Sequence, residues 1–205
     1  MQLQNEHYCV SVTSDALVFP KNICTAAYDA VYGQEEHNGR EVVTVFSVEI
    51  RGRFGMRRIA LVGDELSVDY HCAVLEEHTL TVLQNKRVRR IHLETGEMLM
   101  DKLVGSYGCN WAIYSVENCY VIHGEEEITM LDRDLCKKWD VSAREIYASR
   151  TKGMAFEIED GIIKVYDFED TYYEYDLNGM LLREILAEER SDCPKTCHSN
   201  DNVIG

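Results

Sequence analysis

Apolar and polar side chains alternate with a period of two along much of the chain. The longest such run covers residues 41–50, where Val, Phe and Ile are interspersed with Thr, Ser and Glu. This period places successive side chains on opposite faces of a strand, so it is typical of half-buried β-strands. Shorter runs of the same kind lie at 7–12, 15–19, 57–62, 71–75, 79–83, 88–93, 111–116, 119–123, 127–131, 154–158, 162–167 and 172–176. We therefore predict an all-β, mainly antiparallel fold.

Three segments repeat one pattern: a strand, an acidic residue, a tight turn and a second strand. The pattern centres on the pairs Leu93-Glu94, Leu131-Asp132 and Tyr175-Asp176, which are 38 and 44 residues apart. A further hairpin and an apolar strand precede each segment, which makes four strands per repeat. We predict repeat units at 66–104, 107–147 and 153–187, with Leu93, Leu131 and Tyr175 in equivalent inward positions.

The period of about 40 residues and the turn at 175–182 resemble the loosely patterned blades of bacterial β-propellers. The resemblance covers about residues 66–187. It implies a small β-propeller or an open, curved stack of repeated four-stranded meanders. We expect one β-repeat domain over 1–190 and a flexible tail over 191–205.

Two segments admit a second interpretation. Between Pro20 and Gly33 the apolar residues fall at helical spacing, so a short helix is one of two interpretations of that segment. Residues 179–190 also have a helical pattern, but the repeat alignment favours a strand over 180–186.

Composition narrows the class of protein. The chain has 205 residues, 45% of them hydrophobic, with 21 Lys and Arg against 36 Asp and Glu, a net charge of −15. No apolar run approaches the roughly 20 residues of a membrane-spanning helix, and the first residues lack a secretory signal pattern. We therefore expect a cytoplasmic protein whose eight cysteines are mostly reduced core thiols; disulfides are the alternative.

Charge is unevenly distributed. Residues 111–205 contain ten basic and 21 acidic side chains, whereas 1–110 contain 11 and 15. This balance disfavours nucleic acid as a partner. Two basic clusters, which we expect to be solvated strand faces and turns, comprise Arg51, Arg53, Arg57 and Arg58, then Lys86, Arg87, Arg89 and Arg90.

Recognisable catalytic motifs are missing from the sequence. It has no phosphate-binding glycine loop, no Gly-x-Ser-x-Gly elbow and no His-Glu-x-x-His helix, so we expect no cofactor. His71, His92 and His123 could meet at a site, although scattered histidines are more often surface or core residues. Cys193, Cys197 and His198 could supply three zinc ligands, with a disulfide, exposed thiols or a plain tail as alternatives; we predict no metal.

One acidic hairpin also carries aromatic side chains, the residue type that anchors protein interfaces. We predict that it forms a negatively charged platform for a basic protein partner; solvated hairpin tips and a catalytic carboxylate pair are the alternatives. The predicted partner-binding residues are Tyr166, Asp167, Phe168, Glu169, Asp170, Tyr172, Tyr173, Glu174 and Asp176.

These observations favour a noncatalytic protein-binding module. In size, charge and lack of catalytic motifs the chain resembles small acidic cytosolic immunity proteins of bacteria. That resemblance implies an inhibitor that neutralises a basic partner such as a nuclease toxin. The alternatives are a hydrolase or lyase with its site at a propeller mouth, and a structural subunit of a larger complex. The oligomeric state is not indicated.

Overall fold

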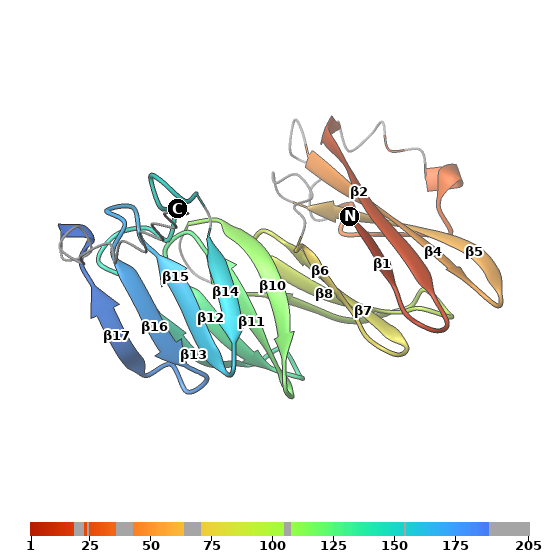
Figure 1. Ribbon diagram of the computed structural model, residues 1–205. Helices are drawn as coiled ribbons and strands as arrows, with labels where there is room; N and C mark the ends of the chain where they lie inside the picture. Colours follow the sequence, from red (N-terminus) through yellow and green to blue (C-terminus); the bar gives the residue numbers. More distant parts are fainter. Residues whose placement is uncertain are drawn as a thin grey trace, which may run out of the picture. The chain divides into compact units, whose positions relative to one another are not determined.

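The chain consists mainly of β-strands (Figure 1), and it divides into two units. The computed structural model describes residues 1–18, 23, 25–35, 43–63, 71–104, 108–153 and 155–188. The units comprise Met1–Ile146 and Tyr147–Gly205. Nearly all strand pairs are antiparallel, so the predicted all-β class is confirmed. The tail predicted at 191–205 lies outside the described residues.

The first sheet has five strands in the order β1-β2-β4-β5-β3. β2, β4 and β5 pair antiparallel, β1 adds to the free edge of β2, and β3 pairs parallel with β5. The runs predicted at 7–12 and 15–19 belong to a single strand, and neither β1 nor β3 was predicted. The bounds are Gln2–Gln4 (β1), Cys9–Val18 (β2), Ala30–Tyr32 (β3), Val43–Gly52 (β4) and Gly55–Gly63 (β5).

The helical interpretation of 20–33 is not supported by the described part of that segment. Thr25–Ala27 forms one turn of 3-10 helix, and the chain then extends into β3. Ala30 pairs with Ile59 and Tyr32 with Leu61, so neighbouring strand β5 supplies hydrogen-bond partners that a local helix would have replaced. Tertiary pairing has overridden a weak local preference.

Three four-stranded sheets follow, each a meander in which consecutive strands are neighbours. They lie within the ranges 66–104, 107–147 and 153–187 and have the four-strand organisation of propeller blades. β17 begins at Leu181, which confirms the strand interpretation of 180–186. The second sheet contains Ala73–Leu75 (β6), Thr79–Gln84 (β7), Arg87–His92 (β8) and Met98–Leu103 (β9). The third contains Asn110–Val116 (β10), Cys119–Gly124 (β11), Ile128–Asp132 (β12) and Lys137–Val141 (β13). The fourth contains Phe156–Glu159 (β14), Ile162–Tyr166 (β15), Tyr172–Asp176 (β16) and Leu181–Ile185 (β17).

The repeat alignment is correct for two sheets and shifted by two residues in the second sheet. In each sheet a register shift occurs just before one residue of the third strand: Ile91, Leu131 and Tyr175. All three are buried. Leu93 is also buried, but it follows the strand and its structural counterpart is not Leu131. One extra residue in the β8–β9 turn conceals the true register in the sequence.

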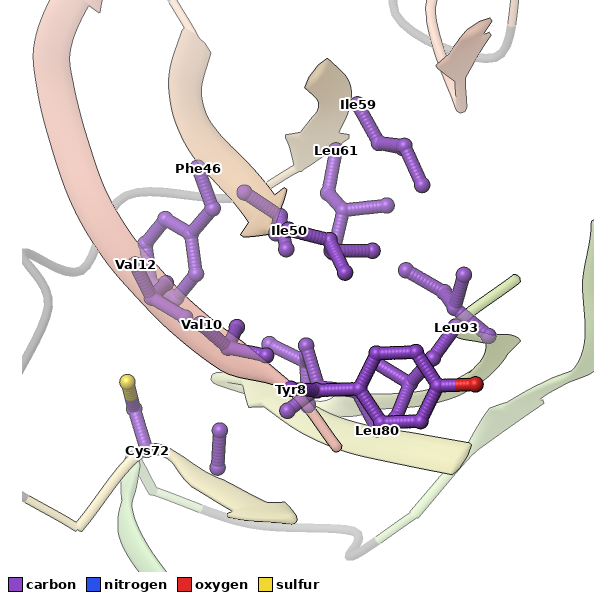
Figure 2. Close-up of a cluster of buried hydrophobic side chains, with 14 residues drawn as sticks. Tyr8, Val10, Val12, Phe46, Ile50, Ile59, Leu61, Cys72, Leu80 and Leu93 are labelled. Carbon is purple, nitrogen blue, oxygen red and sulfur yellow. The ribbon is translucent and has the colours of Figure 1, made fainter. Parts of the chain in front are cut away.

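Apolar side chains of the first and second sheets form one core (Figure 2). Val10 and Val12 of β2 and Phe46 of β4 belong to it, together with Leu80 of β7. A second cluster joins the second and third sheets and includes Leu83, Val88, Ile113, Tyr120, Ile122 and Leu131. Leu80 and Leu83 of β7 belong to the first and the second cluster respectively, so the second sheet is buried on both faces.

Two adjacent arginines of β8 are buried on opposite faces of the second sheet. Arg89 is fully buried, and its Nη1 donates to the carbonyl oxygen of Val62 on β5 at 2.9 Å. Arg90 is 9% exposed, and its Nη2 donates to the hydroxyl of Tyr120 on β11 at 3.1 Å. The prediction of solvated basic faces is therefore wrong for these two residues.

The backbone at Gly33 lies very close to the buried guanidinium of Arg89. Arg89 Nε donates to Asp101 at 3.1 Å and Nη1 donates to Gln84 Oε1 at 2.8 Å. A Cβ atom at Gly33 would lie 2.5 Å from Arg89 Nη2, and Gly33 has a φ of 83°. Glycine is therefore required here both by space and by backbone conformation.

We expect Ile91→Ala and Leu131→Ala each to destabilise the protein by about 2–5 kcal/mol, because each removes buried methyl groups and leaves a cavity. Urea denaturation measures the change. Leu103→Ala is the control: Leu103 is 72% exposed, so its removal should change stability by no more than about 0.5 kcal/mol. Unchanged midpoints for Ile91→Ala and Leu131→Ala would contradict the assigned register.

We expect Arg89→Ala to cost about 3–5 kcal/mol, because it removes a fully buried side chain and takes this donor from the Val62 carbonyl and the Gln84 side-chain oxygen. Arg51→Ala is the matched control, since Arg51 pairs with Glu49 at the surface and such pairs contribute at most about 1 kcal/mol. Equal losses in the two variants, measured by thermal or urea unfolding, would show that burial of Arg89 contributes nothing.

Candidate functional site

The predicted partner-binding residues lie on the β15–β16 hairpin of the second unit, but on two faces of its sheet. Strand alternation directs Tyr166, Tyr172 and Glu174 to the partly exposed face and Tyr173 to the buried face. We call the partly exposed face of β14–β17, together with the loop 167–171, the outer surface.

Asp167 and Tyr173 do not belong to the exposed part of this surface. Asp167 is fully buried; its Oδ1 accepts from the backbone N–H of Thr171 at 2.9 Å and its Oδ2 from the Tyr173 hydroxyl at 2.8 Å. Beside them the hydroxyls of Tyr147 and Tyr175 lie 3.1 Å apart, and burial raises the pKa of Tyr147. This carboxylate therefore closes the hairpin turn and cannot meet a partner.

Charges on the outer surface alternate across the four strands. Cross-strand neighbours run from Glu157 to Lys164, Glu174 and Arg183, one residue from each strand. Glu159 also pairs with Lys164, and this hydrogen bond lowers the pKa of Glu159. Opposite charges in such positions stabilise a sheet. The surface is thus less uniformly acidic than the sequence predicts.

Aromatic rings on this surface hold cations from the chain itself. The rings of Tyr166 and Tyr172 lie 5.1 Å apart, and Lys152 Nζ sits 4.1 Å from the Tyr166 ring centre. The Arg150 guanidinium lies 4.7 Å from the ring of Phe168, which is 39% exposed. These are cation–π geometries.

Glu169 and Asp170 are held by the segment 149–153. Arg150 forms an ion pair with Glu169. The Ser149 hydroxyl donates to Asp170, and this hydrogen bond, with the backbone N–H of Thr151, lowers the Asp170 pKa. Both carboxylates therefore have cationic or hydroxyl partners within the unit.

Asp176 lies at the other end of β16, in the β16–β17 turn. Its Oδ1 accepts from the backbone N–H groups of Met180 at 2.8 Å and Asn178 at 2.9 Å, and these bonds lower its pKa. Asp132 makes the same pair of bonds in the β12–β13 turn, with Asp134 and Cys136. Because the two turns have the same hydrogen bonds, we assign Asp176 a structural role.

Ser149, Arg150 and Lys152 were missed at the sequence level. These residues precede the start of the hairpin at Ile162 by 10 to 13 residues and have no strand periodicity, so nothing in the sequence places them against the hairpin. The one signal in the sequence was local: Arg150 and Lys152 are basic side chains within the strongly acidic half of the chain.

An exposed apolar strip lies on and around β17, the edge strand of the fourth sheet. Met180 is 60% exposed, and Leu181, Leu182 and Leu186 are between 38% and 47% exposed. Clustered exposure of large apolar side chains is typical of interaction surfaces.

The other candidate residues are scattered. His123 packs against Trp111, His71 against Tyr114, and His92 accepts from the Thr95 backbone, so the three histidines form no common site. Across the described ranges no group of three or more potential metal ligands occurs. Cys193, Cys197 and His198 lie outside those ranges.

The cysteine prediction holds in part. Five cysteines within the described residues are free thiols, and Cys72 is buried as expected, whereas Cys9 and Cys136 are exposed. No helix within the described ranges is long and apolar enough to cross a membrane.

Comparison with known proteins identifies no family. No family model and no curated protein matches the chain. Among solved structures, BamB from Moraxella catarrhalis is 9% identical with a TM-score of 0.47, over 70% of this chain and 47% of BamB. The computationally designed Ika8 protein is 12% identical with a TM-score of 0.48, over 90% and 60% of the respective chains. The AfRom2 CNH domain is 11% identical with a TM-score of 0.47, over 89% and 52%. The chain therefore spans about half the length of BamB, and these distant likenesses concern the fold alone.

We expect the pKa of the Asp176 carboxyl, followed by NMR in the folded protein, to lie below the ordinary range of an aspartate, because the backbone N–H groups of Met180 and Asn178 stabilise its charged form. Because the folded-state pKa is depressed, Asp176 contributes stability above the unfolded-state value, and this contribution is lost as pH falls through the folded-state value. Asp176→Asn is the control, since Asn can form the same turn without titrating. The stability advantage of the wild type over Asp176→Asn should shrink in acid; an Asp176 whose pKa is that of an ordinary aspartate, or higher, would contradict this.

Proposed function

We propose that the protein is a noncatalytic protein-binding module whose outer surface contacts a basic protein partner. The observation that carries this proposal is the row of Tyr166 and Tyr172, flanked by Phe168, on an acidic unit. Tyrosine presents a large apolar ring and a polar hydroxyl, which suits it to interfaces.

Charge supports a cationic partner. Residues 147–188 contain ten Asp and Glu against four Lys and Arg. Local ion pairs reduce the field of individual carboxylates, but the unit keeps its negative excess. Such a field raises the association rate of a basic partner and weakens as salt is added.

The aromatic rings support the same chemistry. Lys152 on Tyr166 and Arg150 on Phe168 are cations of this chain placed on the rings that we assign to the interface. The faces of these rings therefore suit cationic side chains, and a basic partner would present more of them.

A nuclease toxin is one such basic partner. A protein that covers a phosphate-binding site with carboxylates would act as an inhibitor or immunity protein, and this is the specific form of the function that we propose. Products of neighbouring genes are therefore the first partners to test.

We expect the triple variant Glu157→Gln, Glu159→Gln, Glu169→Gln to associate about three- to tenfold more slowly with the purified partner, with a flatter salt dependence. Surface plasmon resonance at several salt concentrations measures both. We expect Phe168→Ala to act differently, by accelerating dissociation, because it removes a packed ring.

The matched control carries the same change of charge at exposed acids of the first unit: Glu97→Gln, Glu117→Gln, Glu145→Gln. It should retain most of the association rate. Equal slowing in the two triple variants would show that only net charge matters, and a partner that is acidic or neutral would overturn the proposal.

A further inference from the structure

A cavity of about 270 Å³ lies in the first unit, where three loops meet. Glu6, His7 and Tyr8 come from the β1–β2 connection, Arg53 from the β4–β5 turn and His78 from the β6–β7 turn. The volume is below the roughly 300–1,000 Å³ of most small-molecule pockets, so it suits a side chain better than a larger ligand.

Three aromatic rings form the walls of the cavity. The imidazoles of His7 and His78 lie within 8° of parallel, with centres 6.5 Å apart. The Tyr8 ring is at 86° to both, with centres 6.3 Å from His7 and 6.4 Å from His78. Two parallel walls and a perpendicular floor make a slot, which the sequence did not reveal because the two histidines are 71 residues apart.

The core and the side chain of Asn5 hold the floor of the slot in place. Tyr8 is 6% exposed and lies at the margin of the first core cluster, with its hydroxyl directed away from Val10 and Val12 (Figure 2). The side chain of Asn5 fixes the loop, since its Oδ1 accepts from the backbone N–H groups of His7 at 2.9 Å and Tyr8 at 2.8 Å.

Asn5 also ties the two walls together. Its Nδ2 donates to the carbonyl oxygen of Glu76 at 2.9 Å, and Glu76 lies two residues before His78. The separation of the imidazoles is therefore set by a hydrogen bond between their loops as well as by the core beneath them.

Carboxylates surround the slot. Glu6 lines it directly, and Glu77 Oε1 lies 3.4 Å from His78 Nε2. Arg53, which also lines the slot, is paired with Glu94 at 3.2 Å. A second cavity of about 290 Å³ shares Glu6 and His7 and adds Glu76 and Glu77. The acidic surroundings favour a cation.

We propose that this slot binds the guanidinium group of an arginine on a protein partner. A flat group between two rings needs about 7 Å between their planes, twice the contact distance of about 3.5 Å. The ring centres are 6.5 Å apart, so the planes are at most 6.5 Å apart, and the imidazoles, which are both exposed, must separate by at least about 0.5 Å to admit the group. Guanidinium is planar and stacks on aromatic faces, whereas the ammonium of lysine is neither flat nor forked.

The inference goes beyond the proposed function, because it concerns another unit and stands if the outer surface binds nothing. Glu6 would accept hydrogen bonds from the edge of the stacked guanidinium. The slot thereby adds a preference for arginine over lysine, which an acidic surface alone does not provide.

We expect the peptide acetyl-Gly-Arg-Gly-amide to shift the imidazole NMR signals of His7 and His78 in a saturable titration of the full chain. The peptide acetyl-Gly-Lys-Gly-amide should bind about fivefold more weakly, because only the flat cation fills the slot. His78→Ala and Glu6→Gln should each reduce arginine-peptide affinity at least about threefold; both residues are exposed, and circular dichroism checks that the fold is intact. Glu97→Gln is the matched acidic control and should bind as the wild type does.

Equal affinity for the arginine and lysine peptides would overturn the proposal, as would unchanged binding by both His78→Ala and His7→Ala. The outer-surface triple variant separates the two proposals. If it abolishes binding of both peptides, the peptides bind at the outer surface and the slot is not an arginine site. If arginine selectivity persists in that variant, the slot carries it.

Discussion

The first unit depends on the burial of two neighbouring guanidinium groups, Arg89 and Arg90, on opposite faces of β8. A buried cation is tolerated only when hydrogen-bond acceptors and a counter-charge surround it. Arg89 donates hydrogen bonds to Val62, Gln84 and Asp101, and Arg90 donates to the hydroxyl of Tyr120. These partners come from three sheets. The need to hydrogen-bond both arginines of β8 therefore restricts which sheets can lie on either side of it.

The Arg90 side of this arrangement extends into a larger polar network. The Tyr120 hydroxyl donates to Glu76 at 2.7 Å, and the Arg133 guanidinium pairs with the same carboxylate and lies over the Tyr120 ring. The backbone carbonyl oxygen of Glu76 also accepts the hydrogen bond from Asn5 Nδ2. The loop that carries His78 is thus held from the core side by contacts of Glu76.

Both candidate binding surfaces combine aromatic rings with carboxylates, but they use them differently. On the outer surface, cations of the chain already cover the rings of Tyr166 and Phe168, so a partner must add to or displace them. In the slot, His7, His78 and Tyr8 enclose a space that Arg53 also lines, and Arg53 is paired with Glu94.

The sequence by itself determined most of the strands and, over residues 66–187, their grouping in fours, because period-two burial and recurrent turns are local properties. It also located the acidic hairpin. It could not show that Asp167 points inward, that Arg89 is buried, or that His7 meets His78. Each of these depends on which strands and loops become neighbours in space, and that is decided by packing and by the need to satisfy buried polar groups. The shifted register at Ile91 has the same origin, since hydrogen bonding between β8 and β9, and not the spacing of acidic residues, sets which side chain faces the core.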